Sequence, residues 1–111
     1  MSVAEPLELL SHATEFAFYP TGCEPGNPDA RYYIVTVARK GRDRWAVMWM
    51  GECWNGADWE YEPLPSSRTD DFLDRCRFPL DEAVRIATAL PDTLVMNGRT
   101  WAQIQEWRGT S

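Results

Sequence analysis

The chain has only one histidine and three cysteines, and their positions in the sequence match no catalytic, disulfide or metal-binding pattern. His12 has no nucleophile beside it in the sequence, which disfavours a histidine-based triad. Cys23, Cys53 and Cys76 are odd in number and far apart, so neither a disulfide framework nor a zinc site is expected. We therefore expect buried, unreactive thiols, and no bound metal or cofactor.

Other signals of catalysis or membrane insertion are also missing. There is no Walker loop, no G-x-G-x-x-G and no G-x-S-x-G. No apolar run approaches the roughly 18 to 20 residues that a membrane helix needs. The N-terminal residues MSVAEPLELL carry acids where a secretory signal carries basic residues. The sequence therefore predicts a cytoplasmic protein that is not an enzyme.

The composition is that of one folded domain with unevenly distributed charge. Of the 111 residues, 44% are hydrophobic and 25% are charged, which is typical of a single globular domain. The net charge of −6 arises between residues 52 and 82, where acids greatly outnumber arginines. A cluster of the opposite sign surrounds Asp43 and consists of Arg39, Lys40, Arg42 and Arg44. Such a charge distribution affects which partners approach, and it does not decide the fold.

The order of elements predicts a single α+β domain over residues 1–111. A three- to four-stranded antiparallel meander is expected, with two or three short helices packed on it. Asn55-Gly56 favours a two-residue type I′ turn between two of the strands. The expected strands are residues 14–19, 31–38, 44–54, 57–62 and a short one at 92–96.

Helix signals are strongest in the second half of the chain. Residues 80–90 carry an apolar i, i+3, i+4, i+7 stripe that ends at Pro91. Residues 66–76 predict a short helix capped by Ser67 or Thr69, and Thr100 opens a capping box before a helix at 101–107. Residues 20–30 form a Pro/Gly loop, and residues 1–13 are expected to be a flexible segment with a short helix near Leu7.

The stretch RWAVMWMGECWNGADWEY, residues 44 to 61, holds four of the six tryptophans. If Arg39 pairs with Arg44 and Asn55-Gly56 is a two-residue turn, side-chain alternation places Trp54 and Trp59 on the core face. The helix at 80–90 is the expected cover of that face. The opposite face is apolar over two strands and acidic over the third. It is either covered by the strand at 14–19 or by the last helix, or open as an aromatic patch, and a single bulge inverts the whole assignment.

An open second face predicts a protein-binding surface, because Trp and Tyr dominate binding hot spots. The predicted contact residues are Tyr32, Trp45, Trp49, Asp58, Glu60 and Glu62. The acids favour a protein partner with a basic surface. A homodimer through the same face is the closest competing interpretation.

Two other function classes remain as alternatives. The basic turn with Arg39, Lys40, Arg42 and Arg44 could clamp nucleic-acid phosphates. The sequence pI of about 4.7 opposes this interpretation. A small hydrolytic or metal-dependent enzyme, built on paired carboxylates such as Asp70 and Asp71, is the third alternative.

The run WEYEPLPSSRTDDFLDRCRFPLDEAVRIA (59–87), together with VMNGRTW (95–101), resembles small uncharacterised proteins encoded by actinobacterial phages and prophages. The use of ten arginines and one lysine is compatible with a GC-rich coding source. The resemblance implies a small accessory protein that acts in the host cytoplasm and binds a host protein or defence factor. It assigns no site residue.

Overall fold

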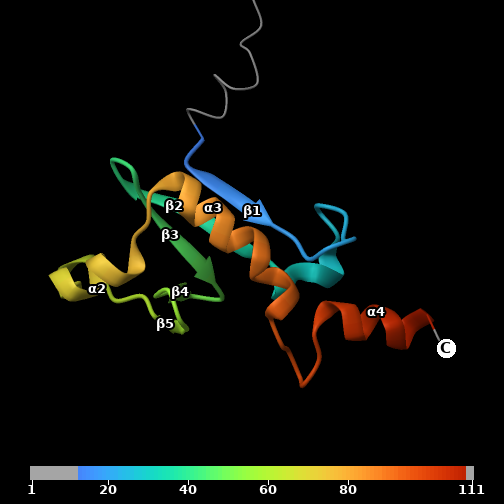
Figure 1. The fold of residues 1–111 in the computed structure, drawn as a ribbon. Coiled ribbons are helices and arrows are strands. Elements are labelled where there is room, and N and C mark those ends of the chain that lie inside the picture. Colours follow the sequence, from blue (N-terminus) through green and yellow to red (C-terminus); the bar gives the residue numbers. More distant parts are fainter. Residues whose placement is uncertain (1–12, 110–111) are drawn as a thin grey trace, which may run out of the picture.

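The computed structural model describes residues 13–109, which form one antiparallel sheet with helices packed against it (Figure 1). The five strands are neighbours in chain order: β1 (Glu15–Phe18), β2 (Val35–Gly41), β3 (Arg44–Trp49), β4 (Glu52–Trp54) and β5 (Trp59–Tyr61). The α-helices are α2 (Asp70–Cys76), α3 (Leu80–Ala89) and α4 (Trp101–Gly109). Short 3-10 helices are η1 (Pro28–Tyr33), η2 (Pro65–Ser67) and η3 (Pro91–Thr93). The α+β class is confirmed, and the sheet has one strand more than the three or four expected.

The helices begin where the sequence signals place them. The Thr69 hydroxyl accepts a hydrogen bond from the Phe72 amide at 3.1 Å, which caps α2. Before α4, the Thr100 amide donates to the Gln103 side chain at 2.8 Å, and the Gln103 amide donates to the Thr100 hydroxyl at 3.2 Å. This reciprocal pair confirms the predicted capping box. Pro91 follows the end of α3 and starts η3, as its missing N–H requires.

The predicted strand pairing is wrong at three turns. A bulge between Arg39 and Gly41 pairs Arg39 with Trp45 and shifts the β2–β3 register by one residue. The long strand expected at 44–54 is divided by a turn at Met50 and Gly51, which both have positive φ angles of 48° and 82°. The loop after Trp54 then has four residues instead of two, because Trp54 pairs with Trp59.

The corrected register places all four tryptophans of residues 44 to 61 on one face of the sheet. Trp45 and Trp49 alternate along β3, Trp49 pairs with Glu52, and Trp54 pairs with Trp59. The prediction that Trp45 and Trp49 lie opposite Trp54 and Trp59 is therefore wrong. A one-residue shift moves every side chain of a strand to the other face, which explains the error.

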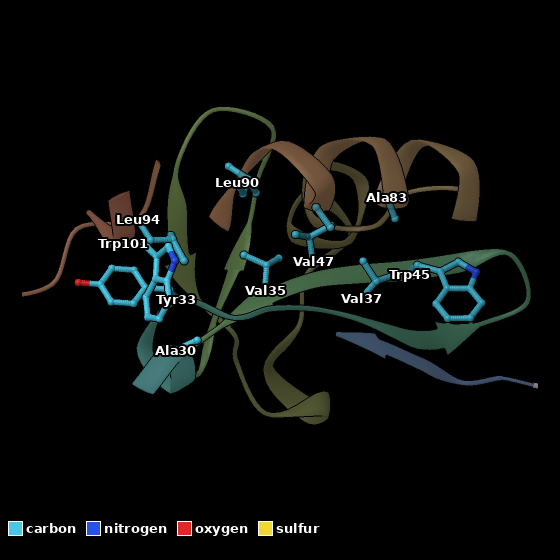
Figure 2. Packing of buried hydrophobic residues seen from close by; sticks show 11 residues of the cluster. Ala30, Tyr33, Val35, Val37, Trp45, Val47, Ala83, Leu90, Leu94 and Trp101 are labelled. Atoms are coloured by element: carbon cyan, nitrogen blue, oxygen red, sulfur yellow. The ribbon is translucent and has the colours of Figure 1, made fainter. Parts of the chain in front are cut away.

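Helix α3 covers β2 and β3 on this face, as Figure 2 shows for the valines between strands and helix. The main core consists of Val35, Val37, Trp45 and Val47 from these strands, Ala83, Ala87 and Leu90 around α3, and Ala30, Tyr33, Leu94 and Trp101 toward the other end. The prediction that the helix at 80–90 covers the core face of the sheet is confirmed. Trp45, however, is only 5% exposed in this core and does not lie on an open face.

A second, smaller core lies on the opposite face of the sheet. Cys53 from β4 packs with Phe72 and Cys76 from α2, and Met48 and Leu73 pack against them. Met48 pairs with Cys53 across β3 and β4, so both point to the face opposite the tryptophans. The helix that covers the second face is therefore α2, whereas the sequence favoured the strand at 14–19 or the last helix.

The ends of the chain and two short segments also differ from expectation. Residues 31–33 belong to η1, so the strand predicted from residue 31 begins at Val35. The strand predicted at 92–96 is replaced by η3 and an isolated bridge between Met96 and Arg99. The Pro/Gly loop is tied to η3 by the Thr21 amide, which donates to Asp92 at 2.8 Å. The helix expected near Leu7, and all but the last residue of the flexible segment 1–13, lie outside the described residues.

Candidate functional site

Three tryptophan rings form one connected group on the tryptophan side of the sheet, and two tyrosines lie next to them in the structure or along the strand. The Trp49 and Trp59 rings lie 5.4 Å apart, and the Trp54 and Trp59 rings lie 5.2 Å apart. The Trp49 indole N–H donates to the Tyr32 carbonyl at 3.0 Å, which joins η1 to β3. Tyr61 follows two residues after Trp59 on β5 and so points to the same side. We call the set Tyr32, Trp49, Trp54, Trp59 and Tyr61 the aromatic face.

The exposure of these rings increases away from α3. Trp49, Trp54 and Trp59 are half-buried, whereas Tyr32 is 42% exposed and Tyr61 is 72% exposed. Helix α3 has its main contacts with β2 and β3, which explains why the rings on β4 and β5 keep part of their surface. Of the three aromatic residues predicted as contacts, Tyr32 and Trp49 belong to this group. Trp45 does not, because it is buried in the main core, where its ring lies 5.7 Å from that of Phe16.

The three predicted acids do not form one rim. Asp58 is exposed in the loop between β4 and β5 and accepts a hydrogen bond from the Trp59 amide at 2.8 Å. Glu60 pairs with Cys53, and Glu62 follows it in alternation, so both lie on the α2 side of the sheet. The structure therefore separates Glu60 and Glu62 from the aromatic face. Glu52, which pairs with Tyr61, is the strand carboxylate on the aromatic side of β4.

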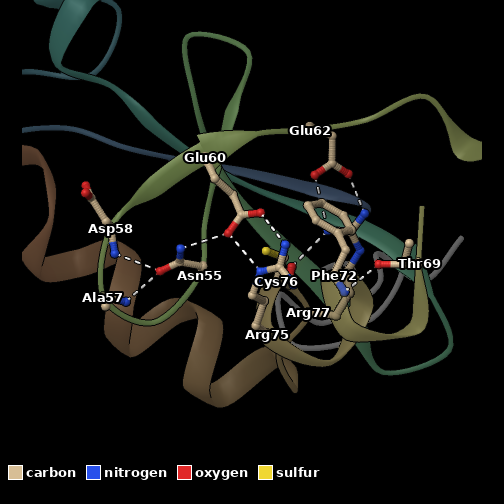
Figure 3. Close-up of polar contacts among 10 residues, drawn as sticks. All are labelled: Asn55, Ala57, Asp58, Glu60, Glu62, Thr69, Phe72, Arg75, Cys76 and Arg77. Atoms are coloured by element: carbon tan, nitrogen blue, oxygen red, sulfur yellow. Dashed lines mark hydrogen bonds and ion pairs between the residues drawn. The ribbon is translucent and has the colours of Figure 1, made fainter. Parts of the chain in front are cut away.

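Glu60 is held by two partners across the sheet and helix (Figure 3). Arg75 donates from Nη2 to Glu60 Oε1 at 2.7 Å and from Nε to Oε2 at 2.9 Å, and the Asn55 amide donates to Oε2 at 2.8 Å. The Arg75 hydrogen bonds, with that from Asn55, lower the pKa of Glu60 from 4.5 to about 2. Glu60 is therefore a structural carboxylate that joins β5 to α2.

Glu62 is more deeply buried and is shared by two arginines. Arg77 forms an ion pair with Glu62, and Arg68 Nη2 lies 3.3 Å from Glu62 Oε1. Burial alone raises the pKa of Glu62, but hydrogen bonds from Arg77 and Cys53 outweigh it and leave the pKa below its ordinary value. Both carboxylates are therefore paired with arginines on the α2 side of the sheet.

The thiols lie in two separate places. Burial raises the pKa of Cys53 and of Cys76, which interact with one another in the smaller core. Cys23 lies in the Pro/Gly loop and is half-buried. Within residues 13–109, no group of three or more His, Cys, Asp or Glu side chains is placed to hold a metal ion.

The predicted basic cluster lies at the tip of the β2–β3 hairpin. The side chains of Arg39, Lys40, Arg42 and Arg44 are exposed there. Arg44 lines a pocket of about 240 Å³ together with Asp74 of α2, and Asp43 accepts from the Leu80 amide at 3.4 Å. The basic tip therefore lies next to Asp74, which belongs to the acidic stretch at residues 52–82, and the two charge clusters are not at opposite ends of the molecule. Nucleic-acid binding by this tip stays a prediction.

The sequence did not indicate a second concave region, which lies between η1, the 96–99 turn and α4. This pocket has a volume of about 270 Å³, and its lining includes Tyr32, Arg99 and Trp107. These residues are up to 75 positions apart in the chain, so no local pattern could have predicted their meeting.

Comparison of the chain with protein-family models, with curated proteins and with solved structures finds no match in any of the three. No helix among the described residues is long and apolar enough to cross a membrane.

Proposed function

We propose that this protein is a non-enzymatic protein-binding module whose contact surface is the aromatic face. The observation that carries the proposal is the chain of ring contacts through Trp49, Trp59 and Trp54, which packs against the main core and leaves each ring partly exposed. The exposed part of each tryptophan ring is apolar surface in contact with water, and a partner that covers it gains the free energy of its burial. Trp and Tyr are also the side chains that most often carry binding energy.

The rigidity of the face supports the proposal. Each tryptophan ring contacts another ring, and the Trp49 indole N–H is fixed on the Tyr32 carbonyl. Rings that are already held in place lose little conformational freedom when a partner binds, so more of the contact energy appears as affinity. Under the resemblance to phage proteins, the partner would be a host protein or a defence factor.

The proposal is tested by affinity capture with the full chain from an actinobacterial lysate. The test variant combines Tyr32→Ser and Tyr61→Ser, and the control is Leu64→Ser, because Leu64 is 68% exposed at η2, outside the aromatic face. We expect capture of a specific protein to fall by about tenfold or more in the double variant, as for hot-spot residues. The control should capture it normally, and unfolding midpoints should show that both variants fold.

Light scattering on the same samples identifies a second copy as the partner. A homodimer would have twice the mass of the 12.8 kDa chain, and the double variant would be a monomer. If the wild-type protein and the double variant capture the same proteins in equal amounts and both stay monomeric, the aromatic face is not a contact surface.

A further inference from the structure

We infer that the pocket between η1 and α4 binds an acidic peptide segment of a protein partner. An apolar side chain of that segment would lie between Tyr32 and Trp107, with a carboxylate against Arg99. The inference rests on the proposed function only in part, since Tyr32 belongs to both surfaces while Arg99 and Trp107 lie outside the aromatic face.

The pocket combines an apolar floor with aromatic walls. Tyr33 is buried at the floor, where Met96 and Ile104 are half-buried. The walls are more open, since Tyr32 is 42% and Trp107 is 58% exposed. A volume of about 270 Å³ is near the lower end for ligand pockets, which fits a side chain or two of a peptide better than a large cofactor.

Hydrogen bonds fix the shape of the pocket. The Tyr33 hydroxyl donates to the Arg99 carbonyl at 2.9 Å, which ties η1 to the 96–99 turn. Within that turn, the Met96 amide donates to the Arg99 carbonyl at 2.9 Å, and the Arg99 amide donates to the Met96 carbonyl at 3.1 Å. An ion pair of 3.1 Å between Arg108 and Asp29 joins α4 to η1. Because its residues are already held in place, the pocket loses less conformational entropy when a ligand binds than a flexible site would.

The charge around the pocket is opposite to that of the whole chain. Arg99 lies 5.2 Å above the Trp107 ring, and Arg31 lies 4.9 Å above the Tyr32 ring. The pocket itself is lined by two arginines, Arg99 and Arg108, and by a single acid, Asp29, in a chain whose net charge is −6. An acidic segment is therefore attracted to this end of the molecule. Arginine beside aromatic rings is also the pattern that recognises acidic peptide motifs.

A nucleic acid fits these observations less well. Arginines and aromatic rings also bind single strands, but such sites need a continuous basic groove along the backbone. Here Asp29 interrupts the positive charge. The basic tip of the β2–β3 hairpin also lies at the other end of the sheet from α4, as Figure 1 shows.

The experiment is an NMR titration of the full chain with short peptides. The probe is N-acetylated Glu-Glu-Phe-Glu-Glu amide, and its matched control carries Lys in place of each Glu. We expect saturable shifts of the Gly98 amide and the Trp107 indole N–H with the acidic peptide alone. Arg99→Gln should weaken this binding roughly tenfold, as expected for the loss of one charge-assisted hydrogen bond. Arg85→Gln on α3, where the side chain is 74% exposed, should leave it unchanged.

Each alternative outcome overturns the inference. Equal binding of the lysine peptide, or acidic binding that Arg99→Gln does not weaken, would show that the pocket does not read carboxylates. Tighter binding of an oligothymidine than of the acidic peptide, with shifts at the same signals, would make it a nucleic-acid site. The Tyr61→Ser variant separates this inference from the proposed function, because it should lose partner capture while it still binds the peptide.

Discussion

Arg77 is nearly buried between α2 and β5, although it carries a full positive charge. Its guanidinium lies 5.4 Å from the Phe72 ring centre, donates to the Cys76 carbonyl at 2.9 Å and pairs with Glu62. Removing a guanidinium from water is expensive, and the ion pair with Glu62 offsets that expense. Part of the stability of the α2 packing therefore depends on the Glu62 carboxylate.

Changing Glu62 to Gln should destabilise the protein by about 3 kcal/mol, because Arg77 would stay buried without its counterion. Urea unfolding at neutral pH measures the change. The matched control is Glu82→Gln, since Glu82 faces Arg85 at 3.8 Å on the exposed side of α3. An exposed pair of this kind contributes well under 1 kcal/mol. Equal effects of the two variants would contradict the importance of the buried pair.

Helix α2 is short and contributes Phe72 and Cys76 to the smaller core, so the stability of that core depends on the capping of its first turn. It spans seven residues, too few for a helix to be stable alone, and Thr69 binds the Phe72 amide. Thr69→Ala should therefore destabilise the protein by about 1 kcal/mol, measured as a lower urea midpoint.

Thr88→Ala is the control for the cap, because the Thr88 hydroxyl only donates back to the Val84 carbonyl within α3. Alanine is the better helix former at such a position, so this variant should be as stable as the wild type or slightly more so. A loss of stability as large as that of Thr69→Ala would show that the hydroxyls matter for a reason other than capping.

Element positions could be predicted where the signal is local. The Thr69 cap, the apolar stripe before Pro91 and the Thr100 capping box each act within a single helix, and the structure contains all three. Strand pairing could not be predicted in the same way. The bulge after Arg39 and the positive φ of Met50 have no marked residue type, and both are set by what the sheet must bury.

The Asn55 loop shows how a correct local signal still gave a wrong register. Asn-Gly favours a turn, and Gly56 does have a φ of 95°. However, the Asn55 side chain accepts hydrogen bonds from the Ala57 and Asp58 amides at 2.9 and 2.8 Å, which extends the loop to four residues. The predicted site was wrong to the same extent. Tyr32 and Trp49 belong to the aromatic face, but Trp45, which was predicted beside them, is in the core. Trp54 and Trp59, which were predicted on the core face opposite Trp49, belong to the aromatic face.

At the scale of the molecule, the sheet is packed on both faces with different chemistry. The α3 side is held by apolar packing of valines and Trp45, whereas the α2 side depends also on ion pairs to Glu60 and Glu62. Because β3 and β4 carry side chains to both cores, loss of the α2 side should weaken the whole sheet. We therefore expect low pH to destabilise the fold mainly by protonating the two carboxylates that hold α2, Glu60 and Glu62.

Stability should fall as the pH is lowered from about 4.5 to about 2. The pKa values of Glu60 and Glu62 are lowered in the folded protein, and that of Glu60 falls from 4.5 to about 2. At neutral pH both carboxylates are charged in either state, so their stabilising contribution is complete. Below pH 4.5 the unfolded chain takes up protons that the folded protein does not, so the contribution is lost as the pH approaches the folded pKa values.

Urea midpoints measured from pH 7 to pH 2 test this behaviour, with Glu60→Gln as the comparison. The variant should start less stable at pH 7 and lose stability less steeply below pH 4.5, because about one fewer proton is taken up on unfolding. Added salt should reduce the difference between the curves, since Arg75 is half exposed and its ion pair with Glu60 is screened. Parallel curves for wild type and variant throughout the acid range would show that Glu60 does not link α2 to the sheet.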